Sequence, residues 1–405
     1  MLATVQAWVG RAARPFSRIS EDARAHERVR FYALIGLALL KLFNLFGAIW
    51  DIQWHASIGR DSFWIPPHIV AAAGFTGALG LALAAVSYET YLDRRGARLQ
   101  GVTRWGGITV APSFLAVTLC LLAAVFFTFL DDQWHRAFGL DVTLWSPPHL
   151  LIGLAMSGVD FSLMFGLFVS AKRQRLQLDW RGGYFWAFVL LGAFMFESAN
   201  YWTSQAFIYG FQHGGAGLLG VLFPLLIGML YPLALVYTLR LSKAYWIVVP
   251  IFVLTLALQY VGTGLAALGF AIMKPVSIID EYVRLNPTTT TALARQFAAQ
   301  NGMSGLIGLQ QAWVMWLSAI PLLLVAVLSL VPAARGRWLV AAPVYSVSVV
   351  LTCWYWFQGV PVMAKYDVTW VHVAVATLLA AAGGLVLGWL GSRLAGAVEA
   401  RAASS

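Results

Sequence analysis

Residues 31–68 read FYALIGLALLKLFNLFGAIWDIQWHASIGRDSFWIPPH, and this stretch decides how the chain folds. A helix needs about 20 mostly apolar residues to cross the hydrocarbon core of a bilayer. The run at 31–54 meets that length, and a second apolar run begins directly after Pro66 and Pro67. The sequence therefore predicts two membrane-spanning helices, 31–54 and 66–90, joined by a short segment rich in polar residues.

The polar segment between these helices has a second copy further along the chain. Residues 50–68 read WDIQWHASIGRDSFWIPPH, and residues 130–149 read LDDQWHRAFGLDVTLWSPPH. Four ionisable positions correspond, with one extra residue in the second copy: Asp51 and Asp131, His55 and His135, Asp61 and Asp141, and His68 and His149. The chain is only 11% charged, so ionisable groups kept together in two copies predict a functional site. We interpret 31–90 and 109–171 as parallel repeat units.

The composition extends the membrane interpretation to all 405 residues. The chain is 60% hydrophobic with a mean hydropathy of +0.74, which is more apolar surface than a soluble domain can cover with polar side chains. We expect an all-α, polytopic membrane bundle of ten helices: 31–54, 66–90, 109–134, 147–171, 184–207, 215–239, 245–272, 306–331, 338–359 and 369–392. Cys120 and Cys353 both lie in apolar runs, which argues against a disulfide framework or a CxxC site.

The net charge of +10 follows the expected topology. Arginine and lysine gather in the basic segment 1–30 and in the short connections on the same side, so the positive-inside rule places both termini in the cytoplasm. The repeated segments then face outwards, in what we expect to be a bacterial inner membrane. Residues 184–272 supply three helices, 273–305 form an extracytoplasmic loop with an interfacial helix, and 306–405 supply three helices and a short tail. The lipid bilayer is the expected partner, nucleic acid is not, and partner subunits or a homo-oligomer stay open.

The spacing of the first copy places its polar residues on one helix face. Asp51 and His55 are four residues apart, and Asn44 and Lys41 continue the same face towards the middle of the bilayer. Ionisable groups at that depth are costly against lipid, so they are expected to face protein or a wet cavity. The second copy has apolar residues at the depths of Asn44 and Lys41. The first unit is therefore the better candidate for a working site.

His68 and His149 each follow a Pro-Pro pair, which is typical of a helix start. The positive end of the helix dipole disfavours imidazolium there, and a neutral imidazole is the form that binds metals. Asp61 and Asp141 lie in the preceding connections, where they could cap the helix or orient a histidine. The predicted metal ligands are Asp51, His55, His68, Asp131, His135 and His149, with Asp61, Asp141, Lys41 and Asn44 as supporting residues.

One carboxylate and two imidazoles per unit suit copper, and zinc or non-haem iron would suit the same donors. The alternative is structural: tryptophans of an aromatic belt, and histidines that hydrogen-bond loop carbonyls. Asp160, inside 147–171, is a separate intramembrane carboxylate that could pair with Lys41, take part in proton movement, or be buried against a neighbouring polar group. Glu197, Asn200 and Tyr201 lie on the motif side of 184–207 without the motif, and His372 ends a faint third copy.

The pattern Asp51-x3-His55-x12-His68 resembles the copper site in the C subunit of particulate methane and ammonia monooxygenases. The resemblance covers eighteen residues, and the second copy departs from it by one residue. It implies that Asp51, His55 and His68 bind copper, and that the activity is oxygen-dependent hydroxylation of a small, poorly polar substrate.

Three functions are compatible with the sequence. The first is a membrane metalloprotein, copper-dependent, acting as an oxidoreductase or as a subunit of one. The second is a transporter for a metal ion, a proton or a small solute, which predicts that polar residues continue to the cytoplasmic side. The third is a structural or cofactor-carrying subunit of a membrane complex, with haem or quinone as its cofactor.

Overall fold

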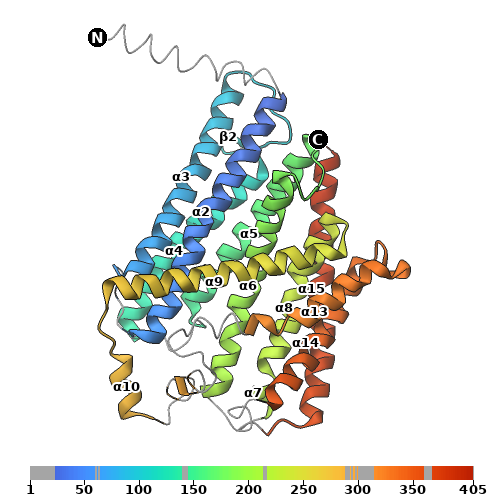
Figure 1. Cartoon of the computed structure of the whole chain (residues 1–405). Coiled ribbons are helices and arrows are strands. Elements are labelled where there is room, and N and C mark those ends of the chain that lie inside the picture. The colour runs from blue at the N-terminus through green and yellow to red at the C-terminus, as the bar shows by residue number, and fades with distance from the viewer. Residues whose placement is uncertain are drawn as a thin grey trace.

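The computed structural model describes residues 23–59, 62, 64–138, 145–212, 217–287, 292, 295–296, 299, 314–359 and 367–404. Their helices are α2 (Ala23–Ser57), α3 (Pro66–Arg94), α4 (Pro112–Phe138), α5 (Pro147–Arg173), α6 (Gly183–Gln212), α7 (Gly217–Gly220), α8 (Leu222–Ser242), α9 (Val248–Met273), α10 (Ile279–Leu285), α13 (Ala319–Val327), α14 (Ala341–Gln358) and α15 (Trp370–Ala403). Single 3₁₀ turns lie at Tyr245–Ile247, Leu328–Leu330, Pro332–Ala334 and Trp338–Val340. The fold is an all-α bundle (Figure 1).

Eight helices in the described part of the chain are long and apolar enough to cross a membrane. They correspond to eight of the ten expected spans. The expected span 184–207 falls on α6, and the described part of 306–331 forms the shorter apolar helix Val314–Leu330. The expected count of ten stays a prediction. A bundle with this many long apolar helices suits a multi-pass membrane protein.

The sequence placed the start of the third span too early. Residues 103–110 form a hairpin of β1 (Thr103–Trp105) and β2 (Ile108–Val110), paired antiparallel, and α4 begins only at Pro112. The turn consists of Gly106 and Gly107, both with positive φ, which is the conformation of a tight hairpin turn and suits glycine. Proline then starts the helix, since it lacks only a donor that has no partner there.

The two segments that carry the motif copies form adjacent helical hairpins, α2 with α3 and α4 with α5. Both hairpin connections lie at one end of the bundle, called the motif end here, and the start of α2 and the end of α15 lie at the other, the termini end (Figure 1). A Cβ added at Gly74 of α3 would lie 2.5 Å from the backbone nitrogen of Asn44 in α2. Glycine therefore lets the two helices pack backbone to backbone, while α9 crosses the bundle against α2 and α6 (Figure 1).

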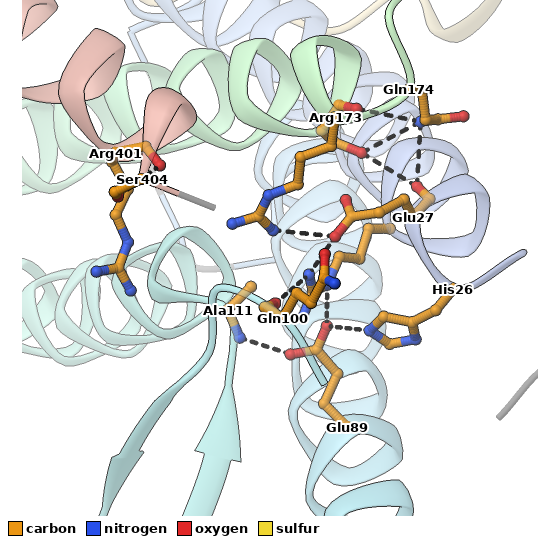
Figure 2. Close-up of polar contacts among 11 residues, drawn as sticks. His26, Glu27, Glu89, Gln100, Ala111, Arg173, Gln174, Arg401 and Ser404 are labelled. Carbon is orange, nitrogen blue, oxygen red and sulfur yellow. Dashed lines mark hydrogen bonds and ion pairs between the residues drawn. The ribbon is translucent and has the colours of Figure 1, made fainter. Parts of the chain in front are cut away.

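A buried polar network holds the termini end together (Figure 2). Arg30 of α2 donates to Glu89 of α3 at 2.5 Å, and Glu89 also accepts from the backbone of Ala111 at 2.5 Å. Glu27 of α2 accepts from Arg173 of α5 at 2.9 Å. The Arg30 and Glu89 side chains are almost fully buried. The network links α2 to both α3 and α5, so it fixes the two repeat units to each other.

A second buried ion pair joins the units nearer the middle of the bundle. Lys41 Nζ of α2 lies 2.5 Å from Asp160 Oδ1 of α5, and Ser198 of α6 donates to Asp160 Oδ2 at 2.6 Å. The Lys41 ammonium also lies 5.4 Å from the centre of the Phe194 ring. The structure thus shows both the pairing with Lys41 and the burial against a neighbouring polar group that the sequence left open for Asp160. The pair ties three helices together at the depth where the motif face of α2 ends.

The segment after α9 packs against the first motif. Ile278 donates its backbone N–H to the carbonyl of Ile58 at 2.9 Å, and Ser277 Oγ donates to the carbonyl of Ser57 at 2.5 Å. Gly59 has a φ of +76°, and a Cβ there would lie 2.6 Å from the Ile279 side chain. The glycine of the first motif is thus required by backbone conformation and by close packing. The short helix α10 follows directly, within the loop for which the sequence predicted an interfacial helix.

Candidate metal centre

The first motif brings three donor groups together. Asp51 and His55 lie in the last two turns of α2, and His68 lies in the first turn of α3, which begins at Pro66 as the Pro-Pro pair predicts. Asp51 Oδ1 is 3.4 Å from His55 Nε2 and 3.1 Å from His68 Nε2. One donor atom from each residue lies within 4.8 Å of the other two, a spacing that could hold one metal ion.

The hydrogen bonding of His68 makes this group suited to a cation. His68 Nδ1 lies 3.1 Å from the backbone carbonyl oxygen of Ser62, and a carbonyl can only accept, so the ring donates from Nδ1. In neutral His68 the Nε2 atom then carries a lone pair, aimed at the Asp51 carboxylate. Asp51 Oδ1 is buried and makes no hydrogen bond with any described residue. Two lone pairs 3.1 Å apart repel each other, unless His68 is protonated or a cation lies among the three donors.

The second motif forms a group of the same composition. Asp131 and His135 lie near the end of α4, and His149 lies in the first turn of α5. Asp131 Oδ1 is 3.5 Å from His135 Nε2 and 3.3 Å from His149 Nδ1. These donors also lie within 4.8 Å of one another. The two copies therefore build two separate three-residue groups and do not converge on one point.

The groups differ in how the second histidine is turned. His149 presents Nδ1 to Asp131, and the same nitrogen lies 2.8 Å from Ser146 Oγ. In the first copy Nε2 has that position, and Nδ1 is held by a backbone carbonyl. The serine hydroxyl can donate or accept, so it does not fix the ring tautomer as the Ser62 carbonyl does. The first group is therefore the one in which the protein fixes the ring tautomer that a neutral histidine ligand needs.

Both groups line one cavity of about 600 Å³. All six predicted ligands line it, together with apolar side chains from five helices or their ends: Leu45, Ile49, Ile69, Phe75, Ile152, Met156, Phe194, Val314 and Met315. The side chains of His55 and His68 are about one third exposed, whereas those of His135 and His149 are half as exposed. The lining is therefore mixed: apolar side chains predominate, and polar groups lie both at the two motifs and deeper, at Lys41, Asn44, Glu197 and Asn200.

The supporting residues from the sequence fall into two classes. Lys41 and Asn44 line the cavity, as the shared face of α2 predicts, and Lys41 is held by Asp160. Asp61 and Asp141 lie outside the described residues, so their expected roles stay predictions.

Part of the motif is structural. Trp54 is buried and packs against Phe270, and Trp145 donates its indole N–H to the carbonyl of Trp202 at 3.2 Å. His372, from the faint third copy, accepts the backbone N–H of Thr369 at 3.0 Å and caps the start of α15. The tryptophans and the third copy therefore have packing or capping roles in the structure, as the structural alternative expects of such residues.

Three further cavity residues come from α6. Glu197, Asn200 and Tyr201 line the cavity from the apolar helix α6. The sequence placed these residues on the motif side but gave them no role. The signal was Glu197 itself, because a carboxylate within an apolar helix is costly and therefore usually functional.

Comparisons of the chain with protein-family models, with curated proteins and with solved structures return no match.

Proposed function

We propose that the chain is an integral membrane metalloprotein in which each Asp-His-His group holds one copper ion, and that it acts as an oxidoreductase or as a subunit of one. The observation that carries the proposal is the first group. Three donors converge there, and the buried Asp51 Oδ1 makes no hydrogen bond with any described residue. A divalent cation would satisfy that oxygen and both imidazole nitrogens together.

The chemistry of the donor atoms limits which metal ions suit the two groups. Imidazole suits copper, zinc and iron, whereas magnesium and calcium prefer all-oxygen sites. The resemblance of the Asp51, His55 and His68 spacing to a copper site favours copper among the three. Bound copper would supply one-electron redox chemistry. The protein supplies the two ligand sets and a predominantly apolar cavity of about 600 Å³, which suits a small, poorly polar substrate.

The packing of α2 between the cavity and the termini end favours a metal site over a transport path. From Lys41 towards the termini end, α2 buries Leu34 and Leu37 in one continuous hydrophobic cluster with Phe114 and Leu163. A permease requires polar groups across the bilayer, and among the described residues of α2 between Arg30 and Lys41 the one side chain with a polar atom is Tyr32, which is exposed. This segment of α2 therefore supports a site near the motif end.

Metal analysis of the purified protein tests the proposal. We expect two copper ions per chain in wild type, and one in each of the variants His55→Ala and His135→Ala. His372→Ala is the matched control, because that histidine caps α15 and lies in neither group, and it should keep both ions. Absence of copper from wild type, or equal copper in wild type and both motif variants, would contradict the proposal.

The redox part has its own test. The copper(II) electron paramagnetic resonance signal should disappear when a reductant supplies one electron per ion, and dioxygen should restore it. A signal that persists under reduction would leave metal binding intact but rule out the oxidoreductase. If the isolated protein contained zinc instead of copper, metal binding would likewise stand and the oxidoreductase would be ruled out.

A further inference from the structure

Two buried oxygen atoms on α6 have no hydrogen-bond partner. Glu197 Oε1 and Asn200 Oδ1 are each shielded from solvent, and neither makes a hydrogen bond with any described residue. Both side chains are more than nine-tenths buried, and both residues line the cavity. They are three residues apart, so they lie on the same face of α6, one turn apart. A buried polar atom without a partner is costly and calls for a ligand.

The kind of ligand follows from the chemistry of these atoms. A carboxylate oxygen and an amide oxygen both accept hydrogen bonds and coordinate cations. While Glu197 is ionised these two oxygens cannot satisfy each other, because neither of them then donates. Their ligand must therefore bring positive charge or donors into the cavity.

The charges around the cavity favour a cation. Among the described residues that line it, Lys41 is paired with Asp160, and Arg136 lies 2.9 Å from Asp132. No lysine or arginine of that lining lies within ion-pair distance of Glu197. An isolated buried carboxylate in an apolar helix is strongly unfavourable, unless it is protonated or a cation joins it.

We infer that Glu197 and Asn200 form a third cation position in the cavity, deeper than the two Asp-His-His groups and specific for a hard divalent ion of the Mn²⁺ type. Carboxylate and amide oxygens are the ligands that Mg²⁺ and Mn²⁺ prefer, and water completes their coordination. The cavity of about 600 Å³ has room for such waters. The inference deepens the proposed function, since it rests on the same cavity being a metal chamber, but its ligands are different residues.

The order of the residues along α6 gives the depth of the proposed cation position within the cavity. Tyr201, Asn200 and Glu197 follow one another away from the motif end, and Ser198 beside Glu197 binds Asp160 at the level of Lys41. A cation at Glu197 would therefore lie deeper than the motif groups, at about the level of the buried Lys41–Asp160 pair. The ammonium of Lys41 does not replace it, because that charge is already balanced by Asp160 at 2.5 Å.

Titration of zinc-loaded protein with Mn²⁺ tests this position. Zinc is added first to fill the two histidine-containing groups, and free Mn²⁺ is then followed by its electron paramagnetic resonance signal. We expect wild type to bind one Mn²⁺ in addition to zinc. Glu197→Gln, which keeps the shape and removes the charge, should weaken Mn²⁺ binding at least about tenfold without changing zinc uptake.

Two further variants control for charge and for folding. Asp132→Asn removes the same charge from the cavity lining, but its carboxylate is already paired with Arg136, so Mn²⁺ affinity should stay within about twofold. Asn200→Asp adds a charged oxygen at the site and should tighten Mn²⁺ binding, which keeps the inference testable if Glu197→Gln misfolds.

The outcomes separate this inference from the proposed function. Zinc uptake without additional Mn²⁺, or equal Mn²⁺ affinity in wild type and Glu197→Gln, overturns the third position alone. Failure of zinc and copper to bind overturns the proposed function, and the response of Mn²⁺ binding to Glu197→Gln and Asn200→Asp still decides the third position.

Discussion

The buried pair of Lys41 and Asp160 allows a quantitative prediction. The two charged atoms are 2.5 Å apart, both side chains are at least nine-tenths buried, and Ser198 completes the hydrogen bonding of Asp160. At an effective dielectric constant of 20, two unit charges at that distance attract by about 7 kcal/mol, most of which offsets the cost of burying them. Removal of one partner leaves the other buried and unpaired, which costs about 3–5 kcal/mol.

We therefore predict that Lys41→Met and Asp160→Asn each lower the free energy of unfolding by about 3–5 kcal/mol. The double variant should lose no more than either single variant, because no unpaired charge remains. The assay is unfolding by sodium dodecyl sulfate titration in detergent micelles, followed by tryptophan fluorescence, with Ser198→Ala as a smaller perturbation of about 1–2 kcal/mol. Additive losses, with a coupling energy below about 0.5 kcal/mol, would refute the pairing as a stabilising unit.

Three further variants test other parts of the fold with the same unfolding assay. Gly59→Ala should cost about 1–2 kcal/mol, because its φ is +76° and Ile279 fills the space, whereas Gly80→Ala, with nothing within 4 Å of its Cβ, should be neutral or stabilising. Glu89→Gln should cost about 3–5 kcal/mol by leaving the buried Arg30 without its main partner, and the exposed Glu281→Gln should change little; equal effects would contradict a structural role for the termini-end network. His372→Ala should cost about 1 kcal/mol through loss of the α15 cap, with no loss of metal, and a lost metal ion would show that the third copy is a ligand.

The sequence predicted the elements that depend on local rules. Apolar length located eight long helices, although α8 begins seven residues later and α15 ends eleven residues later than expected, and the Pro-Pro pairs located the starts of α3 and α5. The four-residue spacing of Asp51 and His55 predicted that they lie on one face, and the structure brings them to 3.4 Å through Oδ1 and Nε2. The sequence also predicted that His68 lies near Asp51 and His55, because the connection between α2 and α3 is short and both helices therefore meet at the same end of the bundle.

What the sequence could not predict depends on packing between distant segments. Whether the two motifs meet at one point is set by how α2–α3 packs beside α4–α5, and no local pattern encodes that distance. The sequence also did not predict the ion pairs of Glu89. Its partners Arg30 and His26 lie about sixty residues earlier in the chain, in a basic segment that indicates only the side of the membrane. The β1–β2 hairpin was missed, because the apolar residues of β2 extend the run of the following helix.

The buried pair of Lys41 and Asp160 shows that the two motif-bearing hairpins depend on each other. At the depth of Lys41 the second unit has Leu121, and at the depth of Asp160, eleven residues after His149, the first unit has Leu79 eleven residues after His68. Each unit thus carries one ionisable residue where the other carries leucine, and the two ionisable residues pair across the interface between units. An isolated charge at this depth is unfavourable in either unit, so neither residue is tolerable without the other. The two motif-bearing hairpins thus contribute complementary residues to one buried ion pair, and both line one cavity.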